Sequence, residues 1–228
     1  MTRVPAVTRA DAAPMRLFGF WRSLATFRVR IALNLKGLAY EETFLDLHAG
    51  DQRRPDYRAV NPQMVVPALL DGGGPPLFQS LAILEYLDER FPEPPLLPAD
   101  ARGRARVRGL AQIVACDSHP LIVPRIRDYL GEFGLDEAQR LTWVRHWIET
   151  GLRAVEAHLG HEETGLYCHG DSVTMADLCV VSLAVGFEIF KGSLADFPHV
   201  SRIAARCLAD DAFARAHPLR QPGAPARV

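Results

Sequence analysis

The spacing of hydrophobic and polar residues predicts a strand followed by a helix near the start of the chain. Residues 16–20 form a short apolar run that is typical of a buried strand. Beyond it, apolar side chains recur at helical spacing, at Phe27, Ile31 and Leu35, and Gly37 is a natural stop for the helix. The basic residues of this helix fall mostly outside the apolar stripe: Arg28, Arg30 and Lys36.

The junction between this strand and helix lies at Arg22 and Ser23. The first N–H groups of a helix have no partner within the helix and carry partial positive charge, so a hydroxyl among them lies where an anion is stabilised. The alternative is that Ser23 only caps the helix. The local sequence alone favours neither interpretation.

Further apolar runs extend this part into a small α/β unit over roughly residues 15–90. The predicted elements are strands at 40–47, 64–71 and 77–78 and a helix at 81–91. Pro67 suits the first residue of its strand, and Ser80 is another capping residue ahead of a helix. The glycine-rich residues 72–76 lack the Lys-Ser or Lys-Thr of a phosphate loop, which favours a hairpin turn.

A proline-rich linker at 92–98 precedes a change in pattern, because the rest of the chain lacks the alternation of strands. The predicted helices lie at about 101–130, 136–159, 174–190 and 199–209. Thr174 and Asp177 have the form of a capping box, with Val173 as its staple residue. The sequence thus predicts an α/β domain at 15–92 and an all-α domain at 101–222.

Composition indicates the class of protein but not any reaction that it catalyses. The chain has 228 residues, 48% hydrophobic and 23% charged, with a net charge of −1. These values indicate a globular protein and do not favour a nucleic acid or a membrane as partner. The four cysteines are scattered without metal-ligand spacing, which predicts reduced thiols in the cytoplasm and no metal site. Residues 1–14 are expected to be a disordered extension.

Several motifs together resemble one family over about residues 15–222. They are 20–23, 28–37, 61–63, Val66-Pro67, 79–83, 116–120, the Thr174–Asp177 box and 217–222. This set is similar to the zeta class of cytosolic glutathione transferases, which includes maleylacetoacetate and maleylpyruvate isomerases. The resemblance implies a thioredoxin-like first domain, a helical second domain and a homodimer in the cytoplasm.

The resemblance also implies a glutathione site on the first domain. Val66, before a cis Pro67, would pair its backbone with the cysteinyl part of glutathione, as an added strand does. Gln79 and Ser80 would take the γ-glutamyl end, although Ser80 could also be a plain helix cap. Ser23 would donate its hydroxyl to the sulfur and favour the thiolate, which is the reactive form.

Two arginines fit the dianionic substrates that the resemblance implies. Arg22 adjoins Ser23, and Arg125 follows in the second domain; either could hold a carboxylate bidentately, although Arg125 could also be a plain surface residue. His119 and, less strongly, Asp117 are carried over as glutathione contacts. Cys116 beside them is expected to be structural.

The chain also departs from the zeta pattern. Leu24 and Ala25 replace small polar residues after Ser23, and Ile189 stands where related isomerases place an arginine. These three changes make the implied site less polar. They keep two alternatives open: a general transferase that conjugates or dehalogenates hydrophobic electrophiles, and a non-catalytic glutathione-binding protein.

The activity that the resemblance implies first is glutathione-dependent cis–trans isomerisation of a maleyl diacid or keto acid, in the catabolism of aromatic amino acids. Addition of the thiolate would leave a single bond free to rotate, and elimination would return glutathione unchanged. Glutathione would therefore serve as a cofactor.

Overall fold

The computed structural model describes residues 15–225, which form two compact units. The first unit extends through Leu96 and resumes at Asp211, and the second is Leu97–Asp210. The expected domain limits of 15–92 and 101–222 differ from this division at the C-terminal end, which here belongs to the first unit. The predicted extension at 1–14 lies outside the described residues.

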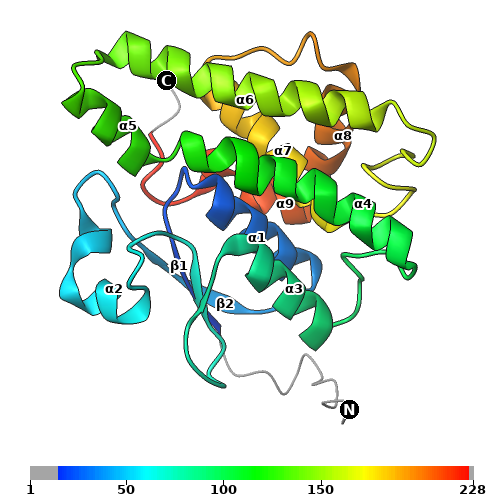
Figure 1. Cartoon of the computed structure of the whole chain (residues 1–228). Coiled ribbons are helices and arrows are strands. Elements are labelled where there is room, and N and C mark those ends of the chain that lie inside the picture. Colours follow the sequence, from blue (N-terminus) through cyan, green and yellow to red (C-terminus); the bar gives the residue numbers. More distant parts are fainter. Residues whose placement is uncertain (1–14, 226–228) are drawn as a thin grey trace. The chain divides into compact units, whose positions relative to one another are not determined.

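The first unit contains a mixed sheet of four strands within the described residues, in the order β2-β1-β3-β4 (Figure 1). The strands are β1 (Met15–Gly19), β2 (Tyr40–Phe44), β3 (Ala68–Leu70) and β4 (Leu77–Phe78). β1 pairs with β2 in parallel and with β3 antiparallel, and β3 pairs antiparallel with β4. The parallel pair requires a crossover, which α1 (Leu24–Leu35) supplies. The α/β prediction for this part of the chain is confirmed.

The remaining elements of the first unit are short helices and α3. They are η2 (Asp51–Arg53), α2 (Pro55–Val60), α3 (Ser80–Arg90), α9 (Asp211–Ala216) and η5 (Pro218–Arg220). α9, which follows the last predicted helix, was not expected. Together with α3 it contacts α1.

Helix α1 is far more buried than its apolar stripe predicts. Its first ten residues are all buried, and the basic side chains outside the stripe, Arg28, Arg30 and Lys36, are 0–1% exposed. The reason is that α1 is a crossover helix that α3 and α9 also contact, so it has little free surface. The apolar stripe alone therefore underestimates how many residues of this helix are buried.

Two of these buried cations are held by ion pairs within the unit. The Arg30 guanidinium lies 2.6 Å from Glu42 of β2 and also donates to the carbonyl oxygens of Phe20 and Trp21. Lys36 Nζ lies 3.2 Å from Asp88 of α3 and donates to two further carbonyl oxygens. Such partners offset the desolvation of a buried charge. Both cations therefore tie α1 to its neighbours.

The second unit is helical, as predicted, but its first long helix is interrupted. The elements are α4 (Ala101–Gln112), η3 (Ile113–Ser118), η4 (His119–Leu121), α5 (Pro124–Glu132), α6 (Glu137–Leu159), α7 (Met175–Ile189) and α8 (Pro198–Leu208). The prediction of one helix over 101–130 was wrong. Segment η3 is a π-helix, and Pro120 and Pro124 cannot continue a helix that donates from their nitrogens.

Helix α7 is the core of the second unit. All its residues from Met175 to Phe187 are buried, and the predicted capping box of Thr174 and Asp177 is present. An Asp177 oxygen accepts from Thr174 N at 2.7 Å, and the other accepts from Cys168 N at 2.8 Å. Within 15–225 no helix is long and apolar enough to cross a membrane.

Candidate functional site

Ser23 begins α1 as its N-cap. Its Oγ accepts a hydrogen bond from Thr26 N at 3.1 Å, and its side chain is half-buried. A hydroxyl has one hydrogen and two lone pairs, so accepting from the backbone leaves the Ser23 hydrogen available to an anion. Leu24 and Ala25 are buried and apolar, and Thr26 is fully buried. The predicted start of the helix at Ser23 is confirmed, and Ser23 is the accessible hydroxyl of the first turn.

Arg22 is oriented by two aromatic neighbours from its own unit. Its Nη2 lies 3.1 Å from Nε2 of His48, and its guanidinium carbon lies 5.6 Å from the centre of the Trp21 ring. Because arginine only donates, Nε2 of His48 accepts and the ring hydrogen lies on Nδ1. His48, which sequence reasoning did not single out, thus fixes the direction of Arg22 beside Ser23.

The start of α3 differs from the prediction. Gln79, with a positive φ of 67°, takes the N-cap position without a side-chain cap, and Ser80 is the first helical residue. Sequence reasoning placed Ser80 at the cap because short hydroxyl residues favour that position. Ser80 is 6% exposed, and its Oγ accepts from Arg28 Nη1 at 3.3 Å. The side chain of Gln79 is exposed.

The segment before β3 places Val66 outside the paired strand. The Val66-Pro67 peptide is cis, and pairing in β3 begins at Ala68. The neighbouring Val65 carbonyl accepts from Tyr57 Oη at 2.6 Å and from Asn61 Nδ2 at 2.8 Å. Burial raises the pKa of Tyr57 to about 12, so the phenol keeps its donor hydrogen. These bonds hold the segment that carries Val66.

Gln63 is a further polar residue at this end of the first unit. Its Oε1 accepts from Gln79 Nε2 at 2.9 Å, which joins the segment before β3 to the start of α3. Residues 61–63 are one motif of the family resemblance, and no role was predicted for Gln63. Nothing in their spacing indicates a side chain that reaches Gln79, because the two glutamines are 16 residues apart.

Ser23, Arg22, Val66, Pro67, Gln79 and Ser80 all belong to the first unit, whereas the other predicted site residues belong to the second. Asp117 lies exposed in η3, His119 is half-buried at the start of η4, and Arg125 is exposed in the first turn of α5. Ile189 ends α7. All four cysteines are free thiols, with Cys116 exposed.

The π-helical segment that carries Asp117 is fixed against α6. Ser118 is buried, and a Cβ added at Gly151 would lie 1.8 Å from its Oγ. Only glycine therefore allows η3 to approach α6 this closely. The approach holds the segment between Ile113 and His119 in place.

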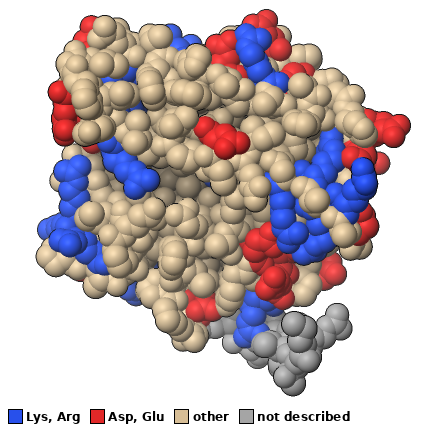
Figure 2. Space-filling view, viewed as in Figure 1, with Lys and Arg blue, Asp and Glu red and all other residues tan. Residues whose placement is uncertain are grey.

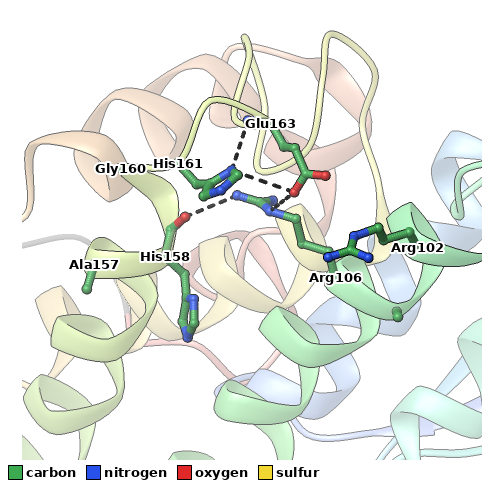
Figure 3. A pocket seen from close by; sticks show the side chains of 8 residues that line it. Arg102, Arg106, Ala157, His158, Gly160, His161 and Glu163 are labelled. Atoms are coloured by element: carbon green, nitrogen blue, oxygen red, sulfur yellow. Dashed lines mark hydrogen bonds and ion pairs between the residues drawn. The ribbon is translucent and has the colours of Figure 1, made fainter.

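A hollow of about 720 Å³ lies between α4 and the end of α6 (Figure 3). Arg106 in its wall donates to the carbonyl oxygens of Cys168 and His158 and to Thr164 Oγ1, and pairs with Glu163 at 3.0 Å. Every guanidinium nitrogen of Arg106 is thus used to bind the loop after α6. The Arg106 side chain thereby joins the loop after α6 to α4.

On the face of the molecule drawn in Figure 2, charge does not single out a site. Figure 2 shows basic and acidic side chains interspersed on the face drawn. The described residues contain no group of three or more His, Cys, Asp or Glu that could hold a metal ion. What the first unit offers is a set of hydroxyl and guanidinium donors at two helix starts, which suits a small anionic ligand.

Comparison with known proteins points in the same direction. Residues 13–89 match the model for the glutathione S-transferase N-terminal domain. The chain is 43% identical to maleylacetoacetate isomerase of Pseudomonas aeruginosa, over 93% of this chain and 100% of that one. It is 46% identical to maleylpyruvate isomerase of a Ralstonia species, over 91% and 99% of the two chains.

Solved structures agree with the sequence matches. A maleylacetoacetate isomerase of Methylobacterium extorquens AM1, crystallised with malonate and glutathione, is 58% identical and superposes with a TM-score of 0.91. The match covers 92% of this chain and 100% of that one. A likeness of this extent spans both units of the fold.

Proposed function

The chain belongs to the zeta class of glutathione S-transferases, and on that premise we propose that it is a glutathione-dependent isomerase of maleylacetoacetate or maleylpyruvate. The observation that carries the proposal is Ser23 at the start of α1, with its hydroxyl hydrogen left available by the bond from Thr26 N. The thioredoxin-like first unit and the helical second unit are those of the glutathione transferase fold.

The donors of the first unit fit glutathione as a bound cofactor. When bound, glutathione supplies a nucleophilic sulfur that converts the cis double bond transiently into a single bond that can rotate. Ser23 donates to the sulfur and, with the N-terminus of α1, favours its ionised form. Ser80 and Gln79 hold the γ-glutamyl end, and Val66 pairs with the cysteinyl backbone.

The substrate carboxylates require cations that are held in place. Arg22 supplies one, oriented by His48 and Trp21 beside the sulfur-activating hydroxyl. We assign a second carboxylate to Arg125, which is exposed in the second unit, and further ligand contacts to His119 and Asp117. Charge that develops on the substrate during addition is stabilised by the same guanidinium groups.

We also propose that the protein works as a homodimer in the cytoplasm. The four free thiols suit a reducing compartment. In the first unit, the large apolar side chains of Met64 and Phe78 are 38% and 57% exposed, and their burial would favour association. Light scattering on the Phe78→Glu variant tests the assembly: we expect a dimer that becomes a monomer.

The function is tested by incubating the protein with glutathione and a maleyl substrate and following the product by NMR. Isomerised product with glutathione unchanged supports the proposal. A stable conjugate, or turnover only of uncharged aromatic electrophiles, would favour the transferase alternative, for which Leu24, Ala25 and Ile189 are the relevant residues. Binding without any turnover would indicate a non-catalytic protein.

Two arginine variants sharpen this test. Arg22→Met and Arg125→Met keep apolar bulk and remove the bidentate donor, so kcat/KM for the maleyl substrate should fall by about 10- to 100-fold each. Conjugation of an uncharged electrophile should change little. If both variants process the maleyl substrate as the parent does, neither arginine holds its carboxylates.

A further inference from the structure

Arg28 is a buried cation that reaches from one helix to the start of another. It lies in the middle of α1, is 1% exposed, and its Nη1 donates to Ser80 Oγ at 3.3 Å. The two residues are 52 positions apart in the sequence, and both belong to the first unit. The contact therefore places a guanidinium directly behind the first hydroxyl of α3.

This contact determines what the Ser80 hydroxyl can do. A guanidinium donates and cannot accept, so Ser80 Oγ must accept from Arg28. The single hydroxyl hydrogen of Ser80 is then directed to another acceptor. A hydroxyl that accepts from a cation is polarised and becomes a better donor, which favours a negatively charged acceptor.

The surroundings of Ser80 strengthen this preference. Ser80 is the first residue of α3, where the N–H groups of the first turn carry partial positive charge. The helix is 11 residues long, and Gln79 does not cap it with its side chain. A buried cation, a polarised hydroxyl and a helix N-terminus thus act at one point, and all three favour a carboxylate.

We propose that Arg28 is a positioning residue that holds the Ser80 hydroxyl as a donor toward the α-carboxylate of the γ-glutamyl group. Arg28 would thereby make the site selective for thiol peptides that carry this carboxylate. The inference rests on the proposed use of glutathione and deepens it. Arg28 acts through Ser80 and makes no contact with the reacting atoms.

The test compares two ligands that differ in one group. Glutathione carries the α-carboxylate, whereas 4-aminobutyryl-Cys-Gly lacks it and keeps the amine and the thiol. Calorimetry gives Kd for both ligands with the parent, Arg28→Gln, Arg28→Lys and Ser80→Ala. Arg16→Gln, an exposed arginine of β1, is the matched control for the loss of one positive charge in the same unit.

We expect Arg28→Gln to weaken glutathione about tenfold and to leave the analogue within twofold. Arg28→Lys, which keeps the charge, should recover part of the loss, and Arg16→Gln should change neither Kd. Because the residues act in series, Arg28→Gln with Ser80→Ala should bind glutathione no more weakly than Ser80→Ala alone. At saturating glutathione, kcat should stay near that of the parent.

An equal loss for both ligands in Arg28→Gln would show a purely structural role and overturn the inference, as would an unchanged Kd for glutathione. If the variant does not fold, the unmutated protein still gives an answer. Its Arg28 guanidinium nitrogen resonance should shift on titration with glutathione and not with the analogue. The same shift with both ligands would contradict the proposal.

These outcomes are separable from the fate of the proposed function. Glutathione binding with the predicted ligand dependence, but without isomerisation of maleyl substrates, would overturn the isomerase and leave the role of Arg28 standing. Isomerisation of maleyl substrates, together with an equal loss of affinity for both ligands in Arg28→Gln, would support the isomerase and overturn the role of Arg28.

Discussion

Ser80 at the start of α3 and Thr174 at the start of α7 are both buried, yet the two helix starts are completed in different ways. At α7 the helix provides its own anion: Asp177 accepts from Thr174 N, Thr174 Oγ1 and Cys168 N. At α3 no side chain caps the helix, and a buried guanidinium lies behind Ser80 instead. One helix start is closed by the chain itself, and the other presents donors to an anion from outside.

The comparison shows that a helix N-terminus can serve either stability or ligand recognition. In the capping box of α7 the Asp177 carboxylate accepts from the N-cap N–H of Thr174 and from Cys168 N, so the chain itself places an acceptor at this helix start. Burial raises the pKa of Asp177, and hydrogen bonds from the backbone and side chains of Cys168 and Thr174 oppose that effect. α1 is intermediate, since Ser23 caps its own helix through Thr26 N and keeps a hydrogen for a ligand.

The largest effect should come from removing the Ser23 hydroxyl, which caps α1 and can also donate to a ligand. Ser23→Ala should lower kcat by roughly 100-fold or more, since one donor to an anion is worth about 2.7–4 kcal/mol. The pKa of the bound thiol, followed by thiolate absorbance, should rise at the same time. A kcat within a few-fold of the parent would show that Ser23 does not activate the sulfur.

Removing the Asp177 carboxylate from the start of α7 should lower stability and leave glutathione binding intact. Asp177→Ala removes the acceptor of three buried donors, and at about 1 kcal/mol or more for each the loss should be about 3 kcal/mol. The expected fall in Tm for a chain of this size is about 6–12 °C. Differential scanning calorimetry measures this fall in Tm. The Tm of Asp177→Asn, which keeps one acceptor oxygen, should lie between those of the parent and Asp177→Ala. A weaker Kd for glutathione in the folded variant would contradict the comparison.

Removing the Ser80 hydroxyl from the start of α3 should instead weaken glutathione binding. Ser80→Ala should raise Kd for glutathione by about 10- to 100-fold, because a hydrogen bond to a charged group contributes about 1.5–3 kcal/mol. Ophthalmic acid, which lacks the thiol, should lose the same factor, whereas Ser23→Ala should hardly change its affinity. An unchanged Kd by calorimetry would mean that Ser80 only helps to start the helix.

The smallest effect should appear in stability. Ser23→Ala removes an N-cap and should lower the free energy of unfolding by about 1 kcal/mol. Ser80→Ala removes no cap, because Gln79 occupies that position, but it takes an acceptor from the buried Arg28 guanidinium and should also cost about 1 kcal/mol. Denaturant titration measures both losses, and a loss well above that of Ser23→Ala would place Ser80 among the structural residues.

Periodicity and local motifs predicted much of the fold and the ends of the helices that matter here. The start of a helix at Ser23 and the Thr174–Asp177 box are local features, fixed by residues within three or four positions of each other, and both are confirmed. The α/β part and the helical part were predicted from the change of pattern after residue 92. Such features depend on short-range geometry, which a sequence displays directly.

Contacts between distant residues could not be predicted in this way. Arg28 meets Ser80, and Lys36 meets Asp88, across 52 residues in each case. Helical spacing reports which side chains share a face, and it does not report what covers the other faces. The π-helix at Ile113–Ser118 and the partnership of Gln63 with Gln79 were missed for the same reason.

The return of the chain to its first unit has a consequence for biosynthesis. Asn34 Nδ2 of α1 donates to the Ala212 carbonyl at 2.9 Å, and the Phe27 ring lies 6.0 Å from that of His217. A ribosome makes α1 before these partners, which follow only after all of Leu97–Asp210. A nascent chain halted at residue 210 would therefore hold α1 without the cover that α9 and His217 supply, so we expect full glutathione affinity only after residues 211–220 emerge.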